Sequence, residues 1–156
     1  MQAPTQITPK GLNDYLEVIT RAVFQSGMSW AVVTAKWDGF REAFEGFDPE
    51  RVAVLSPADV DRLAGDTRII RNRRKIEATV HNAQVLLDID AETPGGFPAY
   101  LKSKADFGQT VAALRSEFRF LGDLGAYYFL YVVQEPVPPH EEWMAAHPSL
   151  GRTRGR

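Results

Sequence analysis

The sequence predicts an all-α fold, a compact helical bundle formed by a single domain. Apolar side chains recur at helical spacing along most of the chain. Proline and glycine signals mark the starts and ends of these stretches, and few segments alternate apolar and polar residues as strands do. The length of 156 residues fits one domain. We place that domain at residues 1–147 and expect a disordered basic tail at 148–156.

The first predicted helix carries one apolar stripe and ends at Gly27. The stripe consists of Leu12, Tyr15, Leu16, Ile19 and Val23. Ser29 is in position to cap a second helix. The apolar residues of that helix are Trp30, Val33, Trp37, Phe40 and Phe44. A tryptophan just inside a helix start, beside a flexible glycine, is well placed to stand at the mouth of a cleft.

Proline signals mark the next helix starts. Asp48 precedes Pro49 and Ser56 precedes Pro57, so each pair puts a capping side chain before a proline at the first helical position. Residues 93–96 read as a loop. Further helices are expected over 72–90, 97–103, 108–117 and 123–134, with a last turn or helix at 141–146.

Composition excludes several classes of site. Without cysteine there is no disulfide, no thiolate nucleophile and no sulfur-ligated zinc. The spacing of His81, His140 and His147 matches no metal motif, so we predict no metal and no cofactor. No apolar run approaches the roughly 20 residues that cross a bilayer. The N-terminus lacks the pattern of a signal peptide, so a cytoplasmic location is expected. We also expect a monomer.

Charge is distributed unevenly along the chain. A net charge of −2 argues against a generally adhesive nucleic-acid binder. Acidic residues crowd at 45–61 and 88–92, however, which leaves room for one basic face. The residues of that basic cluster are Arg68, Arg71, Arg73, Arg74 and Lys75. One interpretation is that these residues are only a solvated helix start. Contact with a phosphate backbone is the other, and it explains why like charges gather.

Together with Trp30 and a second glycine turn at Gly122, the basic cluster suggests a protein that grips nucleic acid and stacks on a base. Stacking on an aromatic face contributes about 1–3 kcal/mol per base. Gly122 allows a tight turn in the hairpin 118–125, and the next helix N-terminus offers free amide donors to a phosphate. Core packing of Trp30 and a plain helix–turn–helix unit are the alternatives.

Several segments, taken together, resemble the DNA-3-methyladenine glycosylase I family of the helix-hairpin-helix DNA glycosylase superfamily. The matching segments are Gln25-Ser26-Gly27-Met28-Ser29-Trp30, Phe47-Asp48-Pro49, Asp59-Val60-Asp61-Arg62-Leu63, Ile69-Ile70-Arg71-Asn72-Arg73-Arg74-Lys75-Ile76 and Phe118-Arg119-Phe120-Leu121-Gly122. The family's zinc-binding cysteines have no counterpart here. The acidic residue with which the family reads the damaged base, eight positions before the tryptophan, is Ala22.

The resemblance implies hydrolysis of the N-glycosidic bond of an alkylated purine, 3-methyladenine-like, flipped out of duplex DNA. Trp30 is the expected stacking platform. With Ala22 in place of the acid, the base would be read by Gln25, Glu17 or Tyr15, and the sequence does not select among them. Met28 occupies the position where related enzymes insert an apolar wedge into the duplex. A methionine that fills a core gap is the alternative for Met28.

The DNA-contacting residues expected on this basis are Gly27, Met28, Arg71, Arg73, Arg74, Lys75, Arg119 and Gly122. Many members of the superfamily place a catalytic aspartate about twenty residues beyond the hairpin glycine. That position is Glu142, next to Glu141, and two exposed glutamates at a helix start are the alternative. No lysine stands where lyase members carry one, so we expect a monofunctional enzyme. A non-catalytic DNA-binding relative and a helical protein-interaction domain are the competing interpretations.

Overall fold

A computed structural model of the protein describes residues 3–147, and every regular element within that range is a helix. The expectation of an all-α fold is confirmed. The helices are α1 (Leu12–Gln25), α2 (Trp30–Ala35), α3 (Trp37–Ala43), η1 (Glu45–Phe47), α4 (Pro49–Val52), α5 (Pro57–Ala64), α6 (Arg73–Glu92), α7 (Gly96–Leu101), α8 (Phe107–Glu117), α9 (Asp123–Val132) and α10 (His140–Ala146). The tail expected to be disordered lies outside the described residues.

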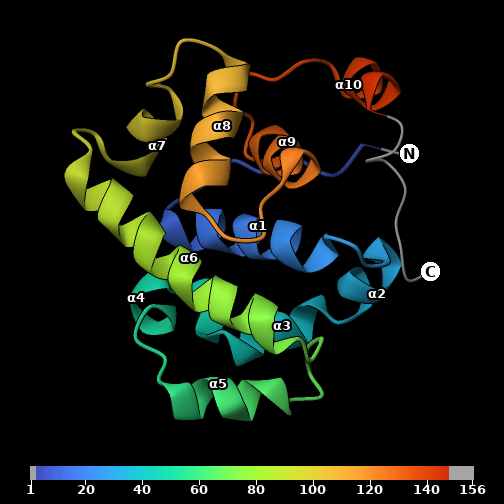
Figure 1. Ribbon diagram of the computed structural model, residues 1–156, viewed down its shortest axis with the longest axis vertical. Helices are drawn as coiled ribbons and strands as arrows, with labels where there is room; N and C mark the ends of the chain where they lie inside the picture. Colours follow the sequence, from blue (N-terminus) through green and yellow to red (C-terminus); the bar gives the residue numbers. More distant parts are fainter. Residues whose placement is uncertain (1–2, 148–156) are drawn as a thin grey trace.

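Helices α1 and α6 run through the middle of the molecule (Figure 1). Helices α3, α4 and α5 lie on one side of this pair, and α7 to α10 lie on the other (Figure 1). Helix α1 packs against both α6 and α9. The apolar stripe predicted for α1 is buried except for the partly buried Leu12, and Leu16, Ile19 and Val23 have no exposed surface. Burial of this stripe is what fixes α1 between the two sides.

The proline-marked helix starts form as predicted. Asp48 accepts a hydrogen bond from the backbone N–H of Glu50 at 3.0 Å. Ser56 and Asp59 form a reciprocal capping box at the start of α5. Asn72 caps α6 through a bond from the backbone N–H of Lys75. This cap fixes where the basic cluster enters the long helix.

The second predicted helix is divided in two. Lys36 interrupts it with a tight turn in which its backbone N–H bonds to the carbonyls of Thr34 and Val33. Helix α3 then turns its aromatic face into a stack, with Trp37 4.8 Å from Phe40 and 5.4 Å from Phe47 between ring centroids. Ser29 occupies the N-cap position of α2, but its side chain makes no capping bond. Aromatic packing therefore outweighs helix continuity at this point.

The hairpin between α8 and α9 differs from the prediction in one detail. The residue with left-handed backbone is Phe120, with φ of 58°. Gly122 has φ of −95° and serves as the N-cap of α9. The turn is therefore tightened at Phe120 and not at Gly122. This conformation is uncommon for a bulky residue, and it leaves the Phe120 ring 40% exposed.

The segment before α1 crosses the end of α9. The backbone N–H of Ile7 donates to the carbonyl of Val132 at 2.8 Å. The side chain of Gln134 donates back to the carbonyl of Ile7, also at 2.8 Å. Pro4 and Thr5 are thereby held beside α1 and α9. No helix within residues 3–147 is long and apolar enough to cross a membrane.

Candidate functional site

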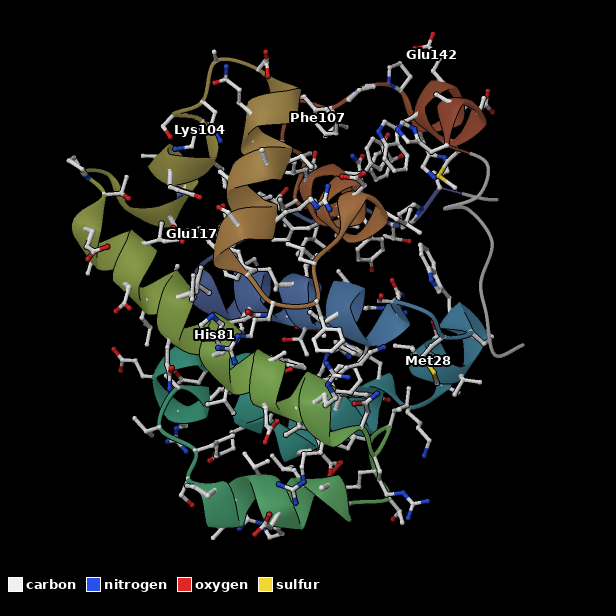
Figure 2. All side chains as sticks on the ribbon, in the orientation of Figure 1. Met28, His81, Lys104, Phe107, Glu117 and Glu142 are labelled. Carbon is white, nitrogen blue, oxygen red and sulfur yellow. The ribbon has the colours of Figure 1, made fainter. Side chains whose placement is uncertain are left out.

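The junction between α1 and α2 presents a glycine turn and a methionine. Gly27 has φ of 71°, a left-handed conformation that glycine adopts without strain. A Cβ atom at Gly27 would meet nothing within 4 Å, so the backbone there is open on its outer side. Met28 follows, partly buried against the core. Figure 2 shows Met28 at this junction, about half-way down the molecule, while Glu142 lies at its upper edge.

A cavity of about 300 Å³ opens directly beside Trp30. Its lining residues come from the N-terminal segment, α1, α2 and α9, and they are Pro4, Thr5, Arg21, Gln25, Trp30, Thr34 and Tyr128. The indole of Trp30 meets the ring of Tyr128 edge to face, with 5.5 Å between centroids. An aromatic wall with a few polar groups, at this volume, is typical of sites that bind small planar molecules.

Polar side chains from α1, α2 and α9 meet in the cavity. The Arg21 guanidinium donates to Thr34 Oγ1 at 2.7 Å and lies over the Trp37 ring at 5.1 Å. Gln25 is 5% exposed, and its Oε1 atom has no hydrogen-bond partner among the described residues. Burial raises the pKa of the Tyr128 phenol, while the charge of Arg21 and a hydrogen bond from Gln25 act in the opposite direction. Tyr128 therefore stays a neutral hydroxyl at physiological pH.

The other two predicted base readers lie outside the lining of this cavity. Glu17 accepts hydrogen bonds from Trp37 Nε1 and Arg41 Nε, both at 2.8 Å. Tyr15 packs edge to face on Phe97, with 5.1 Å between ring centroids, in the buried core. Of the four predicted substrate-binding residues, the structure brings together Trp30 and Gln25.

The basic cluster divides into surface and buried members. Arg71 lies in the segment before α6, and Arg71, Arg73 and Arg74 are all exposed. Arg73 donates to Asp61 on α5 at 2.6 Å. The guanidinium of Arg74 lies over the Phe120 ring of the hairpin at 5.7 Å. Arg74 therefore links the start of α6 to the hairpin, and its charge stays at the surface.

Lys75 has a different position from the one predicted. It is 5% exposed, and its ammonium donates to the backbone carbonyls of Phe24 at 3.2 Å and Ser26 at 2.6 Å. These carbonyls belong to the end of α1, where unpaired acceptors attract a cation. Burial lowers the pKa of Lys75 to about 8. Lys75 thus fixes the α1–α2 junction from beneath, instead of offering a charge to the surface.

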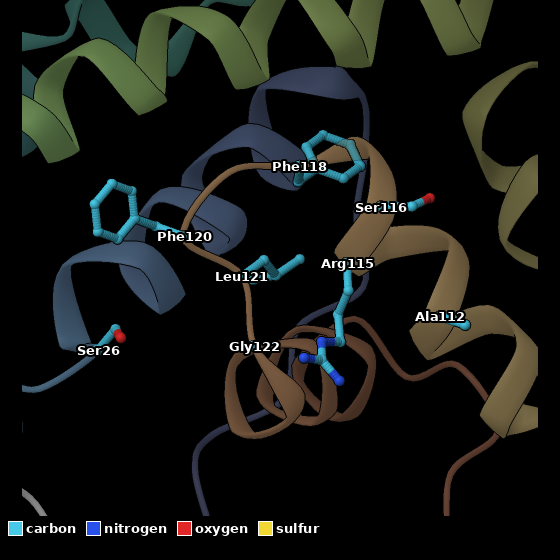
Figure 3. Close-up of a pocket in the computed structure, with 8 residues that line it drawn as sticks. All are labelled: Ser26, Ala112, Arg115, Ser116, Phe118, Phe120, Leu121 and Gly122. Atoms are coloured by element: carbon cyan, nitrogen blue, oxygen red, sulfur yellow. The ribbon is translucent and has the colours of Figure 1, made fainter.

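The hairpin borders an open hollow of about 620 Å³ (Figure 3). Its walls are the hairpin itself, α8 and the end of α1, represented by Phe120, Gly122, Arg115, Ser116 and Ser26. Arg115 forms an ion pair with Asp123 at 2.7 Å, which offsets the carboxylate at the start of α9. Arg119 is exposed on the same hairpin. The hollow and the basic side chains around it form a surface that can receive a phosphate backbone.

The predicted catalytic pair lines neither hollow. Glu141 and Glu142 occupy the first turn of α10 and are exposed. Helix α10 is fixed by Trp143, whose ring stacks on Tyr127 with 4.3 Å between centroids. That packing turns the two carboxylates toward solvent, and Figure 2 shows Glu142 at the outer edge of the molecule. Within residues 3–147 no cluster of three or more potential metal ligands occurs.

Several residues of the two hollows did not stand out in the sequence. Arg21, Thr34 and Tyr128 line the cavity beside Trp30, and Arg115 and Phe120 line the hollow at the hairpin. Arg21 lies four residues before Gln25 on α1, which is the one local signal that could have connected it to the site. Tyr128 reaches the cavity from α9, about 100 residues further along the chain.

Comparison with known proteins places this geometry in context. Residues 9–130 match the methyladenine glycosylase family model. DNA-3-methyladenine glycosylase 1 of Escherichia coli (strain K12) is 42% identical over 66 residues, which is 42% of this chain and 35% of that relative. The match therefore spans about a third of the relative's length.

Solved structures are similar to this protein over a larger part of the chain. A crystal structure of 3-methyladenine DNA glycosylase I is similar with a TM-score of 0.70 and 28% identity, covering 81% of each chain. The 3-methyladenine DNA glycosylase I of Staphylococcus aureus, solved to explain its recognition of 3-methyladenine, gives a TM-score of 0.72 at 25% identity. That similarity covers 83% of this chain and 79% of the other.

Proposed function

Because the chain belongs to the methyladenine glycosylase family, we propose that it hydrolyses the N-glycosidic bond of a damaged purine in DNA. The reference substrate is an alkylated purine of the 3-methyladenine type, flipped out of the duplex. The single observation that carries the proposal is the cavity of about 300 Å³ beside Trp30, next to the open turn at Gly27 and Met28. A flipped base needs such a pocket close to the helix it leaves.

Each part of the surface has a role in this proposal. The base enters the cavity and stacks on the Trp30 indole. The edge-to-face contact with Tyr128 holds that indole in place. Met28 fills the gap that the base leaves in the stack. Arg71, Arg74 and the hairpin around Gly122 hold the backbone, since phosphate contacts position the duplex and carry no sequence information.

The reaction needs little from the protein when the base is a cation. The bond from C1′ to the purine nitrogen breaks with its electron pair going to the base, which leaves as a neutral molecule. Water adds to C1′ and releases a proton to solvent. No lysine follows the hairpin, which reads Gly122-Asp123-Leu124-Gly125, so no Schiff base and no strand cleavage are expected. Glu141 and Glu142 lie outside the cavity, and we assign the chemistry to pocket binding and to the leaving group.

A base-release assay on methylated duplex DNA tests the proposal. The wild-type protein should release free base, and Trp30→Ala should slow release by about 5- to 150-fold while leaving the fold intact by circular dichroism. Glu142→Gln should release base at the wild-type rate, since that carboxylate is exposed at the outer edge of α10. Absence of release from any damaged duplex would contradict the proposed function.

A non-catalytic DNA-binding relative on the same scaffold is the second candidate. One observation favours it: none of the described residues that line the cavity is acidic, and the family's base-reading acid is replaced by Ala22. This candidate predicts salt-dependent binding of damaged duplex without release of free base. The assay above separates the two.

A further inference from the structure

We propose that the cavity beside Trp30 reads the lactam edge of a neutral 6-oxopurine, such as hypoxanthine, in preference to the amino edge of a cationic 3-methyladenine. The inference rests on the proposed function and names the substrate class of that same site. A lactam edge presents an N–H donor next to a carbonyl acceptor. The cavity supplies the complementary pair, an unpartnered acceptor on Gln25 and a donor-only cation on Arg21.

Arg21 makes the cavity electropositive. Its side chain lines the cavity, and Thr34 is its one hydrogen-bond partner within residues 3–147. The Nε atom is buried and has no partner. A guanidinium has five N–H donors and no acceptor, so the remaining donors are available to an oxygen or an unprotonated nitrogen of a ligand. A cationic base in the same cavity would instead meet a like charge.

Gln25 supplies the acceptor. Gln25 is only 5% exposed, yet its amide oxygen makes no hydrogen bond within the described part of the chain. A buried unpaired acceptor is destabilising, and a ligand donor removes that cost. Gln25 lines the cavity and its terminal amide torsion is soft, so rotation of the amide can turn the buried oxygen toward a base. The N1–H of a 6-oxopurine is such a donor.

No carboxylate among the described residues lines the cavity. Among the described lining residues Arg21 is the one charged group. Glu17 lies one turn before Arg21 on α1 and its charge acts on Tyr128, but its carboxylate bonds to Trp37 and Arg41 outside the cavity lining. A pocket that binds a cationic base requires a negative charge or a set of acceptors near it. This cavity has the opposite polarity.

The same polarity suits the bond-breaking step for a neutral base. When the bond from C1′ to N9 breaks, the electron pair goes to the base, which leaves as an anion with charge shared by its 6-oxygen. The guanidinium of Arg21 stabilises that charge as it develops. Water adds to C1′, and the proton that it loses neutralises the departing base.

Binding of free bases tests the inference independently of catalysis. Hypoxanthine and adenine differ at the 6-position, so they form a matched pair, with 3-methyladenine as the third ligand. Isothermal titration or NMR shifts should show that wild-type protein binds hypoxanthine at least about tenfold more tightly than adenine or 3-methyladenine. Equal affinities, the reverse order, or no binding of hypoxanthine at millimolar concentration would overturn the inference.

Variants identify the residues responsible. Arg21→Leu should reduce the preference for hypoxanthine to about threefold or less. Gln25→Glu is isosteric and adds the missing carboxylate, so it should shift the preference toward 3-methyladenine by about tenfold. Arg51→Leu removes an exposed arginine on α4 and should leave every affinity unchanged. A preference that survives in both Arg21→Leu and Gln25→Glu would contradict the assignment.

Base release separates this inference from the proposed function. Duplexes that contain hypoxanthine and duplexes that contain 3-methyladenine are compared with the same protein. Faster release of hypoxanthine supports both proposals. Faster release of 3-methyladenine supports the glycosylase and overturns the lactam reading. Release of neither base contradicts the glycosylase, and the free-base affinities still decide how the cavity reads its ligand.

Discussion

The buried side chain of Asn82 pairs with both backbone groups of Arg119. Asn82 Oδ1 accepts from the Arg119 N–H at 2.8 Å, and Asn82 Nδ2 donates to the Arg119 carbonyl at 3.2 Å. One amide on α6 therefore fixes the hairpin that precedes α9. The hairpin and the basic start of α6 are joined a second time by the Arg74–Phe120 contact. These two contacts hold the proposed DNA surface as one unit.

Asn82→Ala should loosen the hairpin without changing any charge. It leaves the N–H and carbonyl of Arg119 unpaired, which costs about 1–3 kcal/mol of unfolding free energy. Duplex affinity should fall while the dependence of log K on log salt stays the same. Urea unfolding and binding titrations at several salt concentrations measure both. Gln84→Ala, on the exposed face of α6, is the matched control, and a changed salt slope in Asn82→Ala would contradict this account.

The double variant Arg71→Ala/Arg74→Ala should show the complementary behaviour. Loss of two phosphate contacts lowers the slope of log K against log salt by about 1.8 and weakens binding to all duplex sequences alike. Fluorescence anisotropy over a salt series measures this slope. Arg51→Ala removes an exposed arginine paired with Glu45 on another surface and should leave the slope unchanged. An unaltered slope in the double variant would exclude these arginines from the interface.

Trp30→Ala should weaken binding of a flipped base by about 5- to 150-fold, which corresponds to the stacking energy of about 1–3 kcal/mol. A duplex with a fixed extrahelical base is a suitable probe. Val32→Ala is the control, because Val32 lies on the same helix but is 42% exposed and outside the cavity lining. Equal affinities of the two variants would show that the indole is not a stacking platform.

Lys75 should make stability depend on pH. Its pKa is lowered from 10.5 to about 8 by burial, so between these values the unfolded chain binds a proton that the folded chain does not. The unfolding free energy contributed by this group therefore rises as the pH increases from about 8 toward 10. The difference in stability between wild type and Lys75→Met should grow in the same direction. Urea unfolding at pH 8.0, 8.8 and 9.5 measures it, and a constant difference would contradict the buried position of the ammonium.

The local signals in the sequence predicted most of the helices. Proline after Asp48 and Ser56 fixed two starts, because their caps depend on neighbours within three residues. Local signals also predicted a continuous helix from Trp30 onward, which the structure divides at Lys36. The division arises from a stack of aromatic rings that includes Phe47, beyond the reach of any window centred on Lys36.

The candidate site was harder to predict, because its parts come from distant segments. The glycine junction and Trp30 could be identified from residues that are neighbours in the sequence. The polarity of the cavity could not, since Arg21 lies on α1 and Tyr128 on α9, and their meeting depends on how these helices pack. Lys75 shows the opposite case. The two residues before it, Arg73 and Arg74, are exposed, yet its own helical position turns it inward against the end of α1.

The segment around Pro4 and Thr5 has a consequence for how the site is assembled. It closes one wall of the cavity, and it is held there by bonds to residues of the chain more than 120 positions later. A ribosome-bound chain that has emerged only as far as α8 therefore contains Trp30, Arg21 and Gln25. It lacks the cavity wall that α9 contributes and the bonds that hold the N-terminal segment in place. Ligand affinity should therefore arise only after α9 has been synthesised, when the beginning of the polypeptide can bond to the end of that helix.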